Sequence, residues 1–158
     1  MGKVTTIVRY AEPVLLTLWI GCLWAIGYLV APILFASLED RMVAGMLAGK
    51  MFTAVSFIGL GCGSVLLAMT IMDRSRGLRD RRVLLLGLML ILVVIGEFVL
   101  QPAMAELKQQ GLVEGSKVAA RFGQLHGVAS LLYLFNSVAG LLLLWSSWRE
   151  PLSFRAGE

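Results

Sequence analysis

The chain has 158 residues, of which 58% are hydrophobic and only 15% are charged. Soluble domains are about 45–50% apolar and about 25% charged, so a chain with a mean hydropathy of +0.83 has too few polar side chains to cover a water-facing surface. Its two cysteines, Cys22 and Cys62, both lie in apolar segments, which excludes a small secreted fold held by disulfides.

Four apolar segments follow one another along the chain. Residues 13–37, 51–72 and 122–148 contain no Asp, Glu, Lys or Arg, and residues 83–101 contain only Glu97. A bilayer core about 30 Å thick needs roughly 20 apolar residues of helix. The runs do not alternate in hydropathy as the strands of a membrane barrel do. The sequence therefore predicts an all-α integral membrane protein, with residues 1–158 forming a single antiparallel bundle of four transmembrane helices.

The connections predict the orientation of these helices. Residues 73–82 hold five arginines, and placing this segment and both termini inside gives nine basic residues inside against five outside. Because short positive loops stay cytoplasmic, we expect both termini in the cytoplasm of a cell whose inner membrane holds the protein. No aromatic residue lies among these arginines, so the segment lacks a stacking platform for nucleic acid. We interpret it as a topology signal on a solvated turn.

Prolines and glycines predict how the helices are shaped and packed. Pro32 should kink the first span, and Pro102 should end the third, leaving residues 103–110 as a short helix on the outer surface. Small residues let membrane helices approach closely. The spacing of four between small residues therefore predicts packing faces on the second and fourth spans, at Gly59, Gly63, Gly123 and Gly127.

Polar residues inside the third and fourth spans predict a site near the outer face. Glu97 and His126 lie about one turn inside neighbouring spans, so we expect them to touch, as an ion pair or a neutral pair. Arg121 is a rival partner for Glu97. The same site would include a stripe on the fourth span and residues at similar depth on others, namely Gln101, Ser130, Tyr133, Ser137, Tyr28 and, on the flank, Asn136. Such a network either serves a function or only fixes helix register.

Methionines on the outer side suggest a second interpretation. Thioether and imidazole ligands suit Cu(I), which makes a soft-metal site from His126, Met104, Met51 and Met46 an alternative to methionines that fill irregular gaps. The sequence holds no zinc quartet, HExxH, phosphate-binding loop or nucleophile elbow. No catalytic constellation therefore points to an enzyme.

Several motifs resemble a known family. They are Trp19 with Gly21, GYLVAPILF at 27–35, GKMF at 49–52, EFVLQPAM at 97–104 and FGQLHG at 122–127. Together they resemble an uncharacterised family of small bacterial four-helix membrane proteins that shares its domain with the eukaryotic transmembrane protein 205. This resemblance implies a fold and hints at soft-metal handling or export.

A more distant similarity links the first span to the CopD and HemJ types of four-helix membrane protein. Haem held by histidine is implied for the HemJ type, but this chain has Glu12 where that type has its histidine, seven residues before the tryptophan.

Three functions therefore stay open. The favoured one is a non-enzymatic inner-membrane protein whose polar site binds or passes a small ligand or soft metal ion, or serves a membrane complex. The second is a haem-binding oxidoreductase with His126 as an axial ligand and Met51 or Met104 opposite. The third is a purely structural subunit. We expect the lipid bilayer to surround the protein, and we expect its partner to be a second copy of the chain or a larger membrane complex.

Overall fold

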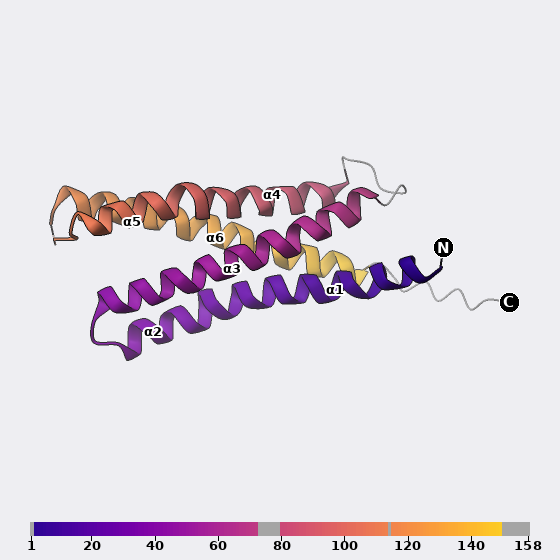
Figure 1. Cartoon of the computed structure of the whole chain (residues 1–158), viewed down its shortest axis with the longest axis horizontal. Helices are drawn as coiled ribbons and strands as arrows, with labels where there is room; N and C mark the ends of the chain where they lie inside the picture. The colour runs from indigo at the N-terminus through magenta and orange to yellow at the C-terminus, as the bar shows by residue number, and fades with distance from the viewer. Residues whose placement is uncertain (1, 73–79, 114, 150–158) are drawn as a thin grey trace.

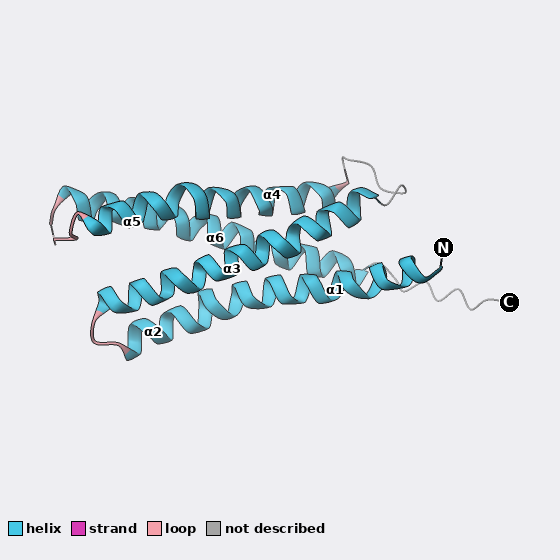
Figure 2. Ribbon diagram, in the orientation of Figure 1, coloured by secondary structure: helices cyan, strands magenta, loops and turns pink. Residues whose placement is uncertain are grey.

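The computed structural model describes residues 2–72, 80–113 and 115–149, with side chains between residues 11 and 146 of these ranges. Every element in them is helical (Figure 2), and the elements join into four rods (Figure 1). The first rod is α1 (Gly2–Trp24), η1 (Ala25–Val30) and α2 (Ala31–Ser37), and the second is α3 (Arg41–Met72). The third is α4 (Arg81–Ile95), η2 (Gly96–Leu100) and α5 (Gln101–Gln109), and the fourth is α6 (Lys117–Arg149).

Each rod contains a stretch long and apolar enough to cross a membrane. The stretches are Ala11–Ser37, Arg41–Met72, Arg81–Gln109 and Lys117–Ser146, which are 27, 32, 29 and 30 residues long. At 1.5 Å per residue, each exceeds the roughly 20 residues that a bilayer core requires. The four predicted apolar helices are therefore confirmed. The basic segment that predicts the orientation lies mostly at residues 73–79, outside the described residues.

Two π-helical segments, η1 and η2, each lie just before a proline. The Ala31 N–H bonds the carbonyl of Ile26, and the Gln101 N–H bonds that of Gly96, each five residues back. Pro32 and Pro102 follow directly. A proline in a helix lacks its own N–H and collides with the carbonyl four residues earlier, and the wider π turn provides room for the ring.

The helix of the third rod therefore continues through Pro102, and the expectation that this proline interrupts the helix is wrong. The expected helix after Pro102 exists as α5, but it extends the rod rather than forming a separate surface helix. In the first rod, where we expected a kink at Pro32, the structure has the π segment η1 just before this proline.

The main core lies toward one end of the bundle. Its buried residues come from all four rods, with Trp19 of α1, Leu66 of α3, Met89 of α4 and Leu143 of α6 among the most deeply buried. The N-terminus lies at this end, which we name the terminal end. The opposite end carries the 38–40 link, and we name it the hairpin end. Toward the hairpin end, the pair α2–α3 and the pair α5–α6 diverge (Figure 1).

Candidate functional site

All four rods meet around a cavity of about 60 Å³. Its lining residues lie near the middle of their helices rather than near one end: Trp19, Leu23, Val55, Ser56, Leu92, Val93, Gly96, Ala129, Leu132, Tyr133 and Asn136. Most are apolar and none carries a charge. The sequence predicted a polar site near the outer ends of the spans, whereas this cavity lies at mid-span.

One wall of the cavity depends on two glycines of α3. Trp19 is fully buried, and its indole packs where side chains on Gly59 and Gly63 would otherwise lie. A Cβ at Gly63 would come within 2.7 Å of Trp19 Cζ3, and one at Gly59 would overlap Nε1. Gly59 and Gly63 thus leave room on α3 for the large side chain of Trp19. Gly123 and Gly127 differ, because both are exposed and a Cβ on either would meet no atom within 4 Å.

Two tyrosines hold α6 against the first rod beside the cavity. The Tyr133 hydroxyl donates to the carbonyl of Leu23, and the Tyr28 hydroxyl donates to Ser137 Oγ at 3.0 Å. The rings of Tyr28 and Phe52 contact that of Tyr133 edge to face, at centroid distances of 6.3 and 5.1 Å. These bonds fix the Tyr133 ring at the cavity wall and commit its proton to a backbone carbonyl.

Asn136 is the least satisfied polar residue of the site. Its side chain is only 4% exposed, and its Oδ1 is the one buried side-chain oxygen or nitrogen in the described residues that lacks a hydrogen-bond partner. An unpaired buried polar group costs about 1–3 kcal/mol, and such a group usually marks a water, an ion or a ligand. The sequence placed Asn136 only on the flank of a stripe, although its spacing of three from Tyr133 puts both on one helix face.

The predicted contact between Glu97 and His126 does not form directly. Glu97 is half-buried in η2, whereas His126 is exposed and stacks on Phe122, with ring centroids 6.0 Å apart. Within the described residues, no hydrogen bond or ion pair joins Glu97 to His126 or to Arg121. Ser130 is also exposed, and its hydroxyl bonds the His126 carbonyl at 2.9 Å.

The divergence of the pair α2–α3 from the pair α5–α6 explains why His126 and Ser130 are exposed. The face of α6 that meets the first rod at Tyr133 and Ser137 continues to His126 and Ser130, but there α2 packs on α3 instead. In the polar stripe, Tyr133 and Ser137 are therefore hydrogen-bonded to the first rod, whereas His126 and Ser130 are exposed. Gln101, predicted as part of the site, instead connects two rods, since its Nε2 donates to the Gly49 carbonyl at 3.5 Å.

The soft-metal candidates do not take part in the cavity. Met104 is buried, Met51 is half-buried, and Met46 and His126 are exposed, and none of the four lines it. Within the described ranges, no three His, Cys, Asp or Glu side chains are grouped so as to hold a metal ion. The donor set at the cavity is a hydroxyl, a phenol, an indole and an amide, and it includes none of the thiolate, thioether or imidazole ligands that suit Cu(I).

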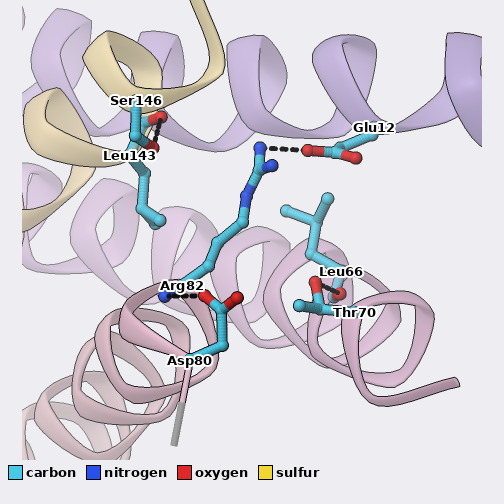
Figure 3. Close-up of polar contacts among 7 residues, drawn as sticks. All are labelled: Glu12, Leu66, Thr70, Asp80, Arg82, Leu143 and Ser146. Carbon is cyan, nitrogen blue, oxygen red and sulfur yellow. Dashed lines mark hydrogen bonds and ion pairs between the residues drawn. The ribbon is translucent and has the colours of Figure 1, made fainter. Parts of the chain in front are cut away.

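An ion pair joins α1 to α4 at the terminal end. The Arg82 side chain, 8% exposed, extends from α4 toward α1, where its Nη2 pairs with Glu12 Oε1 (Figure 3). Asp80 caps α4 by accepting the Arg82 N–H at 2.8 Å. From the sequence, Arg82 is one of five arginines expected on a solvated turn. The signal that this expectation misses is position, because Arg82 borders one apolar run and Glu12 borders another.

Comparison with known proteins identifies a family. Residues 14–112 match the model of a family described as "Domain of unknown function (DUF4149)". The matched region ends before α6, so Tyr133 and Asn136 lie beyond it. No curated protein and no solved structure matches the chain. The expected resemblance to an uncharacterised family is confirmed at this coarse level.

Proposed function

Because the chain belongs to the DUF4149 family, whose domain has no known function, we propose a function from the geometry alone: the central cavity binds or passes a small uncharged molecule within the membrane. The protein would be an antiparallel four-helix bundle in a bacterial inner membrane, with both termini in the cytoplasm. The kinship to transmembrane protein 205 and the distant similarity to the CopD and HemJ types stay predictions.

One observation carries the proposal: a 96% buried amide with an unpaired oxygen belongs to the wall of a cavity at mid-span. A cavity needs only about 10–15 Å³ of accessible volume for one water, so 60 Å³ leaves room for a larger guest. All four rods contribute to its wall, so the cavity belongs to the packing of the whole bundle rather than to poor packing between two helices.

The lining favours this function over the soft-metal and haem alternatives. No methionine, histidine, cysteine or acid lines the cavity, so a metal ion there would lose its hydration without gaining suitable ligands. One observation supports a role in a membrane complex. The exposed face of α6 near the hairpin end carries His126 and Ser130, and polar groups rarely face lipid in an isolated membrane protein.

Carbene labelling tests the proposal. The protein, purified in lipid nanodiscs, is irradiated with a small aliphatic diazirine, and labelled residues are mapped by mass spectrometry. We expect labels on cavity residues such as Leu132, and we expect Ala129→Leu, which adds bulk at the wall, to remove them. Leu131→Phe adds bulk at a position 55% exposed and serves as the matched control. Labels confined to exposed positions, or cavity labels unchanged by Ala129→Leu, would contradict the proposal.

A further inference from the structure

The chemistry of the cavity wall restricts the class of molecule that it can hold. This inference rests on the proposed function and asks which molecule the cavity would select. The wall combines an apolar part, formed by side chains such as Val55, Leu92 and Leu132, with a polar part formed by Ser56, Tyr133 and Asn136. A matching ligand therefore needs an apolar body and a polar group directed at α6.

The first restriction is charge. No Asp, Glu, Lys, Arg or His lines the cavity, and the hydroxyl of Tyr133 donates a hydrogen bond to the Leu23 carbonyl. An ion at this depth would face the cost of a charge in the bilayer interior with no opposite charge to offset it. The ligand is therefore neutral.

The second restriction is hydrogen-bond type. An asparagine side chain offers both an acceptor oxygen and two donor hydrogens, and no other residue bonds the Asn136 oxygen. A ketone or an ether can only accept, so it would leave that oxygen unpaired. A hydroxyl both donates and accepts, and it satisfies the amide whichever way the amide is turned. The Tyr133 hydroxyl donates to the Leu23 carbonyl, so its oxygen adds a second acceptor on the same face of α6.

We propose that the cavity selects neutral, lipid-soluble alcohols, with the hydroxyl bound to the side chain of Asn136 and the apolar part against the leucine and valine wall. The cavity is partly open, so a tail longer than its volume extends toward the surface of the bundle. Water shares the hydroxyl chemistry and is the rival occupant. The two differ in their apolar part, which only the alcohol has.

Matched probes separate these cases. An aliphatic diazirine bearing a terminal hydroxyl is compared with the same chain lacking the hydroxyl. Cavity labelling by each is divided by its labelling of Phe57, which is 56% exposed on α3, to correct for partition into lipid. We expect the alcohol to label the cavity about fivefold more than the alkane, which is the ratio that one neutral hydrogen bond gives.

Variants then assign the preference to one side chain. Asn136→Leu keeps the volume and removes the amide, so the preference should fall to about one while alkane labelling persists. Ser137→Ala, which removes the bond from Tyr28 instead, should leave the fivefold preference intact. Equal cavity labelling by both probes in the natural protein would overturn the alcohol inference and leave the proposed function standing. Labelling by neither probe would overturn both and assign the cavity to water.

Discussion

The ring of Tyr133 occupies the space beside Gly27 that any larger residue would need. A Cβ built on Gly27 would overlap Tyr133 Cε1 and lie 2.8 Å from the hydroxyl oxygen. The ring cannot simply move away, because its hydroxyl is bonded to the Leu23 carbonyl on the same rod. Gly27 and Tyr133 therefore form one unit that sets the distance between the first rod and α6 next to the cavity.

Gly27→Ala should lower the stability of the bundle. Relieving the overlap means shifting the helices or breaking the Tyr133 bond, and overpacking of this kind costs about 1–3 kcal/mol. Thermal unfolding in detergent, followed by circular dichroism, measures the effect. Gly21→Ala is the matched control, since a Cβ there meets nothing within 4 Å. Equal melting temperatures for the two variants would show that the rods separate freely at this point.

A second pair of glycines gives an independent test of packing. Gly59→Ala places a methyl group against the indole of Trp19 and should destabilise the protein by about 1–3 kcal/mol. Gly61→Ala, two residues away on an exposed position, should change stability by no more than about 0.5 kcal/mol. The measurement is again the melting temperature in detergent. If Gly61→Ala proves the more damaging of the two, the assigned face of α3 is incorrect.

Hydropathy was sufficient to predict the four rods, because a bilayer-length apolar run has few alternatives to a helix. The interruptions within the rods were harder to predict. Pro102 resembles a stop signal, and only the structure of η2 shows how a π turn lets the helix continue. The Gly59 spacing correctly suggested close packing on α3, but the same spacing at Gly123 leaves an exposed face. The spacing shows which residues share a helix face, but not whether that face points into the bundle or away from it.

The site could be predicted only in part for a similar reason. Depth arithmetic places Glu97 and His126 at one level, yet it carries no information about how each helix is rotated about its own axis. Tyr133, predicted as part of the site, lines the cavity, and so does Asn136, which the sequence placed only on the flank of the polar stripe. Its unpaired oxygen is a property of the packed bundle, which the sequence cannot reveal.

The absence of a direct bond predicts that Glu97 and His126 act independently. In a double-mutant cycle with Glu97→Gln and His126→Gln, the coupling energy should stay below about 0.5 kcal/mol, as for residues without shared contacts. Unfolding in detergent supplies the four stabilities. Phe122, which stacks on His126, offers a positive control, because Phe122→Leu should couple to His126→Gln. A coupling near 1 kcal/mol between Glu97 and His126 would indicate a bridge between them, such as a shared water.

Reporter fusions test the proposed orientation. The concentration of arginines at 73–82 predicts that this segment is cytoplasmic, and an even number of spans then puts both termini there. Fusions after Glu158 and within the segment at Arg76 should both report a cytoplasmic location. A fusion at Glu39, in the 38–40 link at the hairpin end, should report the opposite side. Any fusion that departs from this pattern would refute the topology.

Loss of the ion pair between Glu12 and Arg82 should destabilise the bundle. A buried charge that loses its partner is destabilising by about 3–5 kcal/mol, but Glu12 is 32% exposed, so water offsets part of this cost. We expect Glu12→Leu to destabilise the protein by about 1–3 kcal/mol, and Glu12→Gln to be milder because its amide oxygen can still accept from the guanidinium.

A control variant separates the effect of breaking this ion pair from the general effect of removing a positive charge. Arg82→Gln should destabilise the bundle in detergent, whereas Arg81→Gln, at the exposed neighbouring position, should not. Combining Glu12→Gln with Arg82→Gln should cost less than the sum of the single changes, since an uncharged pair leaves no buried charge unmatched. Strict additivity would mean that the contact contributes nothing to stability. In that case, the other contacts of Arg82, including its backbone bond to Asp80, would be what holds the start of α4.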